Sequence, residues 1–116
     1  MRVPVLALLL SFAAVPALAE FQKVSSATQF TQIVSGKTLT RPLVELTVTP
    51  DGEIAGTGAA WEVVGEWRWQ DGYFCRDLFW GGMDLGFNCQ EVQVSRDRIR
   101  FTSDRGQGQS AVFRLR

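Results

Sequence analysis

The sequence predicts a mainly β protein: an antiparallel meander that forms a small barrel or a strongly bent sheet, with one short N-terminal helix and one disulfide. Three observations predict this fold class. Hairpin turn signals recur roughly every ten residues from residue 37 onward, only one segment has helical periodicity, and the chain contains two cysteines. Strands joined by short turns pair with their sequence neighbours, and curling or closure then reduces their exposed edges.

The N-terminus has the features of a secretory signal peptide. Arg2 supplies a positive charge, residues 5–15 are apolar apart from Ser11, and Ala17-Leu18-Ala19 is a small-x-small cleavage pattern. The apolar run is shorter than the roughly twenty residues that cross a bilayer. We therefore expect no transmembrane segment after signal cleavage.

These features predict two parts: a signal peptide over 1–19 and a single β domain over 20–116. They also predict a periplasmic or secreted location. Because exported cysteines in even number are usually oxidised, Cys75 and Cys89 are predicted to form a disulfide. In the chain-entropy model, a disulfide that closes a loop of that span stabilises the folded protein by roughly 3 kcal/mol.

Composition removes several kinds of chemistry. The chain contains no histidine, so it lacks the usual general base and the commonest metal ligand. Oxidised cysteines provide neither a thiolate nucleophile nor a zinc site. We expect no cofactor and no metal, and we favour a protein without catalytic activity. With a formal net charge of zero and an export signal, we also expect no nucleic-acid partner.

The single helical signal lies just after the cleavage pattern. Ser26 to Gln29 has the form of a capping box, Phe30, Ile33 and Val34 lie on one helical face, and Gly36 is a C-terminal stop. We expect a short amphipathic helix that covers one end of the sheet.

The remaining chain predicts strands and turns. Val44, Leu46 and Val48 alternate with polar residues and predict one dry face. Turn residues separate this strand from further candidates at 53–58, 63–69, 73–80, 87–94, 99–101 and 111–115.

The register of the hairpin over 65–76 depends on its turn. A three-residue loop ending at Gly72 places Glu66 opposite Arg76 and Trp67 opposite Cys75. A two-residue Asp71-Gly72 turn instead places Trp67 opposite Arg76, as a cation–π pair. We slightly favour the three-residue loop, because it pairs opposite charges across the strands.

Several segments resemble a family of short exported proteins from alphaproteobacteria. They read SGKTLTR, DGEIAG, GEWRWQDGYFCRDLFWGG, NCQEV and DRIRFTSDRGQGQS, and the likeness covers essentially the whole chain after the signal peptide. The resemblance implies a small exported fold and supplies no activity.

Some members of that family carry the label dihydrodipicolinate reductase. That enzyme class needs a dinucleotide-binding βαβ unit and a much longer chain. The nearest pattern here, Gly56-Thr57-Gly58 with the three residues that follow, lacks the third glycine and a following helix. We therefore expect no reductase activity from this chain.

The disulfide would pin residues 76–88, and this segment is the candidate interaction site. Arg76, Trp80, Met83 and Asp84 could anchor a partner, because Trp and Arg dominate interface hot spots and an ordered loop loses less entropy on binding. The alternative, which we favour for the apolar members, is that they fill the core. Trp80 and Met83 are the members we most expect to be exposed.

Three further sets of residues could form sites. Trp67, Trp69 and Tyr73 could line a barrel mouth that holds a small apolar ligand, although interior packing is favoured. Acid pairs such as Asp77 with Asp84, or Glu62 with Glu66, could support hydrolysis only if they flank a cleft. A basic stripe would form if two C-terminal strands are neighbours, one carrying Arg98 and Arg100 and the other Arg114 and Arg116. This stripe could contact lipid headgroups, cell-wall anions or an acidic protein, or it could simply face solvent.

The sequence thus predicts an exported non-enzymatic binding module whose partner is an envelope protein or a cell-wall component. The alternatives are a small-ligand carrier that uses an aromatic barrel interior and a small hydrolase that uses carboxylates.

Overall fold

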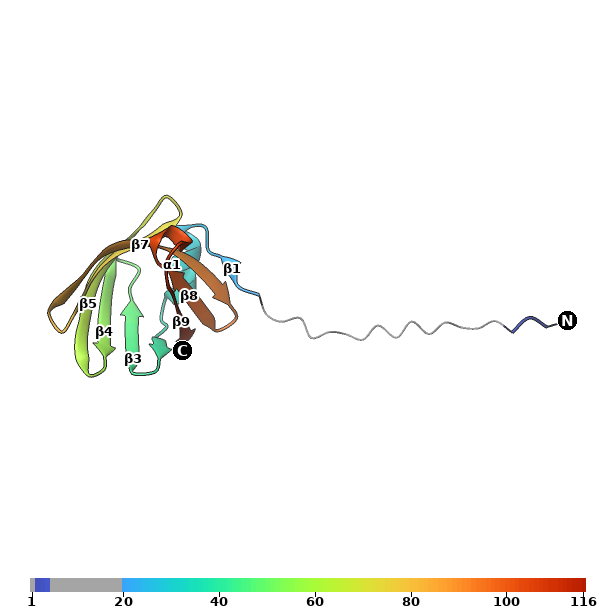
Figure 1. Ribbon diagram of the computed structural model, residues 1–116, viewed down its shortest axis with the longest axis horizontal. Coiled ribbons are helices and arrows are strands. Elements are labelled where there is room, and N and C mark those ends of the chain that lie inside the picture. Colours follow the sequence, from blue (N-terminus) through green and yellow to red (C-terminus); the bar gives the residue numbers. More distant parts are fainter. Residues whose placement is uncertain (1, 5–19) are drawn as a thin grey trace.

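The strands of the protein follow one another around a closed barrel in sequence order (Figure 1). The computed structural model describes residues 2–4 and 20–116, so most of the predicted signal peptide, Met1 and residues 5–19, lies outside the described residues. Eight strands, β2 to β9, pair antiparallel with their neighbours, and β9 pairs back with β2. The predicted antiparallel meander is therefore confirmed as an eight-stranded barrel.

The barrel strands differ widely in length. They are β2 (Leu39–Arg41), β3 (Val44–Val48), β4 (Glu53–Gly58), β5 (Trp61–Gln70), β6 (Tyr73–Trp80), β7 (Met83–Ser95), β8 (Arg98–Thr102) and β9 (Ser110–Leu115). A short strand β1 (Gln22–Lys23) pairs with the end of β7, and a single 3-10 turn, η1 (Asp104–Gly106), joins β8 to β9. The long β7 pairs with β6 along its first part and with β8 along its second.

The predicted helix is present as α1 (Ala27–Val34). The Oγ of Ser26 accepts a hydrogen bond from the backbone N–H of Gln29 at 3.1 Å, as the capping pattern predicts. The side chain of Gln29 accepts from the backbone N–H of Ser25 rather than from that of Ser26. Gly36, with φ of +70°, ends the segment in a conformation that glycine adopts without strain.

Phe30 joins the helix to the barrel core. Its ring lies 5.1 Å from Trp67, 5.5 Å from Trp69 and 5.0 Å from Phe74, measured between centroids. Both Phe30 and Val34 are completely buried. The helix is therefore more than an outer cover, since it inserts an aromatic side chain among rings from β5 and β6.

The β5–β6 hairpin has the two-residue turn, so the favoured three-residue loop is wrong. Trp67 lies opposite Arg76, and both turn residues, Asp71 and Gly72, have positive φ. This register puts Phe74 on the same face as Trp67, whereas a slip of one residue would turn it outward. Burial of these rings outweighs one cross-strand charge pair.

The disulfide between Cys75 and Cys89 is confirmed, and it joins residues that lie directly opposite each other on β6 and β7. Residues 76–88 are therefore a hairpin with a Gly81-Gly82 turn rather than a pinned loop. The disulfide fixes this hairpin at its base.

Truncation of the helix anchor tests its role in the core. We expect Phe30→Ala to lower the free energy of unfolding by about 3–5 kcal/mol, because it removes a ring with several aromatic neighbours and leaves a cavity. Gln32→Ala, on the exposed side of the same helix, should change it by less than about 0.5 kcal/mol. Urea unfolding followed by Trp fluorescence measures both, and equal effects would contradict the anchoring role.

Reduction of the disulfide should destabilise the fold. With a sequence separation of 14 residues, the chain-entropy model gives a loss of about 3 kcal/mol. A Cys75→Ser/Cys89→Ser variant should unfold at the same lower urea concentration with and without reductant. A stability that is unaffected by reductant in the native protein would show that the cross-link adds nothing.

Candidate functional site

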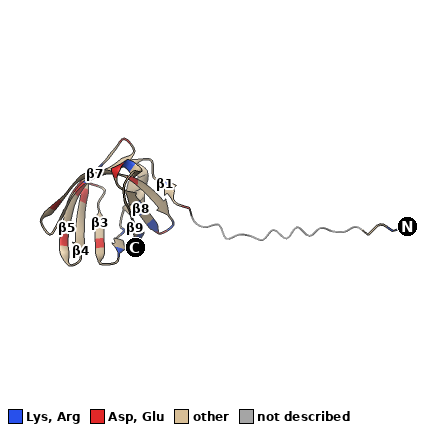
Figure 2. Ribbon diagram, in the orientation of Figure 1, with Lys and Arg blue, Asp and Glu red and all other residues tan. Residues whose placement is uncertain are grey.

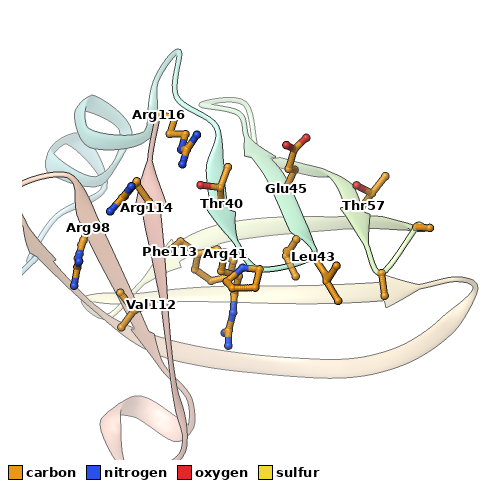
Figure 3. A pocket seen from close by; sticks show the side chains of 14 residues that line it. Thr40, Arg41, Leu43, Glu45, Thr57, Arg98, Val112, Phe113, Arg114 and Arg116 are labelled. Carbon is orange, nitrogen blue, oxygen red and sulfur yellow. The ribbon is translucent and has the colours of Figure 1, made fainter.

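An open groove runs across the outside of the barrel where β9 meets β2 (Figure 3). Its volume is about 1070 Å³. Part of its wall is a row of cross-strand partners on the outer face: Arg98, Arg114, Thr40, Glu45 and Thr57. The other lining residues are Arg41, Pro42, Leu43, Val44, Ala59, Ala60, Val112, Phe113 and Arg116. We call this site the basic groove.

Four arginine side chains and one carboxylate side chain line the basic groove, so the formal charge of the lining side chains is 4 − 1 = +3. The expected neighbour relation between β8 and β9 is confirmed, and Arg98 lies directly opposite Arg114. Like charges in this position repel each other. Asp97 lies 3.6 Å from Arg114, but both side chains are largely exposed, so this ion pair offsets little.

Arg100 does not belong to the basic groove. It lies opposite Val112, bonds to the side chain of Gln93, and places its guanidinium carbon 4.1 Å from the ring centroid of Phe21. The predicted basic stripe therefore contributes Arg98, Arg114 and Arg116, and Arg41 joins them from β2. Arg41 was missed because only barrel closure brings β2 beside β9.

The rim of the basic groove carries an exposed leucine in an unusual conformation. Leu43 is 79% exposed and has φ of +67°, after Pro42 in a two-residue turn between β2 and β3. Proline followed by positive φ is the pattern of a type II turn, which favours glycine at the second position. The structure thus holds a large apolar side chain in solvent at a strained position, a combination common at functional sites.

Replacing Leu43 separates strain from packing. We expect Leu43→Gly to raise the free energy of unfolding by about 0.5 kcal/mol, because relief of positive φ exceeds the added entropy of the unfolded chain. Leu43→Ala keeps the Cβ atom and should give no gain. Thermal unfolding measures both, and a glycine variant less stable than the alanine variant would contradict the strain.

A second hollow, the interior cavity, has a volume of about 180 Å³ and lies inside the barrel. Its polar lining residues are Arg76 and Gln90, and the others are aliphatic or aromatic. Burial lowers the pKa of the Arg76 guanidinium, while the charge of Asp77 acts in the opposite direction. The cavity therefore combines a mostly apolar wall with one half-buried cation.

The four predicted interaction residues do not form one surface. Arg76 lines the interior cavity, and the half-buried Trp80 donates a hydrogen bond from its indole to the carbonyl of Gly58 at 2.7 Å. Met83 is 51% exposed at the start of β7, and the Asp84 carboxylate accepts from the backbone N–H of Gly86. The structure thus separates two inward-facing residues from two exposed ones.

Sequence reasoning missed an apolar patch on the outer face of β5, β6 and β7. Its members are exposed by 39% to 51%: Val64, Phe79, Leu85 and Phe87. Val64 and Phe79 are cross-strand partners. The signal that could have found the patch is alternation, because Phe79 has the opposite parity to the inward residues Phe74 and Leu78.

The three aromatic residues predicted to line a ligand site have other contacts. Trp67 and Trp69 pack against Phe30, and the indole of Trp67 donates to the carbonyl of Thr49 at 2.9 Å. The ring centroid of Tyr73 lies 5.7 Å from Lys23 Nζ and 5.3 Å from the guanidinium carbon of Arg105. None of the three lines the basic groove or the interior cavity.

The candidate acid pairs lie in the open. Glu66 and Asp77 are cross-strand partners, and both are exposed, as are Glu62 and Asp84. None of these four carboxylates lines either hollow. Within residues 2–4 and 20–116, no group of three or more His, Cys, Asp or Glu side chains could hold a metal ion.

Comparisons of the chain with protein-family models, with curated proteins and with solved structures find no match. The resemblance to short exported proteins stays a prediction. Among the described residues, no helix is both long enough and apolar enough to cross a bilayer.

Proposed function

We propose that this protein is an exported, non-enzymatic binding domain that attaches to anionic phospholipid in the cell envelope through its basic groove. The predicted signal peptide and the disulfide support a periplasmic or secreted location. The observation that carries the proposal is that four arginines and one carboxylate line the same groove, together with an exposed leucine.

Charge supports a phosphate-bearing ligand. Arginine guanidinium groups bind phosphate oxygens through paired hydrogen bonds. A phosphate near Arg98 and Arg114 would also relieve the repulsion between these opposed residues. Each basic residue near an anionic membrane surface contributes about 1 kcal/mol of attraction.

The apolar rim favours a lipid surface over a soluble polyanion. Leu43 projects into solvent and Val112 is 39% exposed, both within the basic groove. Stable attachment to a membrane surface usually combines an apolar contact with basic charge. The groove offers both within one site.

The distribution of charge supports one orientation. The net charge of the whole chain is zero, yet Lys and Arg occupy the β8 and C-terminal side, whereas acidic residues mark β3 to β5 (Figure 2). An anionic surface therefore attracts one side of the barrel and repels the other.

Vesicle sedimentation tests the proposal with protein purified from the periplasm of expressing cells. Mass spectrometry should first show Glu20 as the N-terminal residue, because an uncleaved apolar run would itself bind lipid. The protein should sediment with phosphatidylglycerol vesicles and stay in solution with phosphatidylcholine vesicles. Binding should weaken as salt rises, because the attraction is screened.

The variants locate the binding surface. Arg98→Ala/Arg114→Ala should weaken phosphatidylglycerol binding about 30-fold, from about 1 kcal/mol per arginine. Arg68→Ala/Arg105→Ala removes the same charge from exposed positions outside the groove and should bind nearly as the native protein does. Equal losses in both double variants, or equal binding to both lipids, would reject the proposal.

A further inference from the structure

We propose that the interior cavity is a second binding site, independent of the basic groove, which takes a small apolar monocarboxylate on Arg76. The juxtaposition that carries this inference is a guanidinium without an ion-pair partner in a cavity whose other lining residues, apart from Gln90, are apolar.

Arg76 reaches the cavity because of its place on β6. It alternates with Phe74 and Leu78, which also line the cavity, so the three side chains share the inner face. The neighbouring Asp77 has the opposite parity and is exposed. The acid next in sequence is therefore on the other side of the strand.

Within residues 20–116 the Arg76 guanidinium forms no ion pair. Its described hydrogen bond runs from Nη1 to the carbonyl of Gly86, at 2.8 Å. A guanidinium has five N–H donors, and no buried side-chain nitrogen or oxygen among the described residues lacks a partner. The remaining donors of Arg76 are therefore accessible to a ligand.

The surrounding hydrogen bonds leave this cation uncompensated. Asn88 is the cross-strand partner of Arg76 and forms two hydrogen bonds with Asp104. The amide nitrogen of Asn88 donates to the Asp104 carboxylate at 2.8 Å, and the backbone N–H of Asp104 donates to the amide oxygen of Asn88 at 2.9 Å. The carboxylate of Asp104 is thus bound to an amide. Gln90, the other polar lining residue, donates to the Oγ of Ser103.

Partial burial disfavours the charged guanidinium and lowers the pKa of Arg76, and the charge of Asp77 offsets only part of this effect. A carboxylate would accept two parallel N–H bonds from the planar guanidinium. The aliphatic and aromatic wall would then enclose the apolar part of the ligand.

Size limits the ligand to a ring or a short chain. The cavity holds about 180 Å³, and an engineered protein cavity of about 150 Å³ is known to bind benzene. Aryl acetates and chains of roughly six to eight carbons fit this range. Phe30 and its aromatic neighbours fill the adjoining part of the interior, so the ligand cannot extend in that direction.

Calorimetric titration with phenylacetate, hexanoate and octanoate tests the site, with each neutral amide as the matched probe. At least one acid should bind at least tenfold more tightly than its amide. This is the affinity ratio expected for a charge-assisted hydrogen bond. If no acid exceeds its amide, the proposal is overturned.

Arg76→Met keeps an unbranched stem, although a shorter one, and removes the guanidinium and its charge. It should lose at least tenfold in affinity for the acid and keep its affinity for the amide, whereas Arg76→Lys should lie between it and the native protein. Arg68→Met, on the outer face of β5, should bind the acid as the native protein does. Full acid binding by a folded Arg76→Met would overturn the proposal, and thermal unfolding checks that this variant is folded.

The two proposals can fail separately. Arg76→Met should still sediment with phosphatidylglycerol vesicles, and Arg98→Ala/Arg114→Ala should still bind the carboxylate. Loss of carboxylate binding in the groove variant would assign the acid to the basic groove and would overturn the interior site.

Discussion

The packing of Phe30 inside the barrel is the contact on which the rest of the structure depends. An eight-stranded barrel has an interior just wide enough to be filled by side chains or to hold one small ligand. Here the helix supplies a ring that meets Trp67, Trp69 and Phe74. One part of the interior becomes an aromatic core, and the part left beyond the ring of Phe74 is the small cavity at Arg76.

The strand alternation sorts the arginines into two environments. On the outside, Arg98 and Arg114 lie in solvent, where their mutual repulsion costs little and is screened by salt. On the inside, Arg76 loses part of its hydration, forms no ion pair among the described residues, and is offset only by the charge of Asp77 on the other side of the strand. Arginine therefore contributes to an extended positive surface on the outside of the barrel, whereas inside it offers hydrogen-bond donors to a single ligand.

Much of the fold could be predicted from the sequence, because capping, alternation and cysteine pairing are local or nearly local signals. The predicted register of the β5–β6 hairpin is wrong, because burial of Phe74 contributes more than a cross-strand charge pair between Glu66 and Arg76. The sites were harder to predict. The basic groove needs the contact between β2 and β9, and β2, with three residues, carries almost no pattern of its own. The inward direction of Arg76 follows only once the register is known.

The seam between β2 and β9 has a consequence for how the chain folds. Every other barrel pairing joins strands that follow each other in sequence, so those hairpins form over short loops. The seam instead joins Leu39 to Leu115 and Thr40 to Arg114, with Thr38 and Arg116 exchanging two backbone hydrogen bonds. Closing so long a loop costs the most entropy and rests on the fewest rungs. The barrel should therefore close last and open first at this seam.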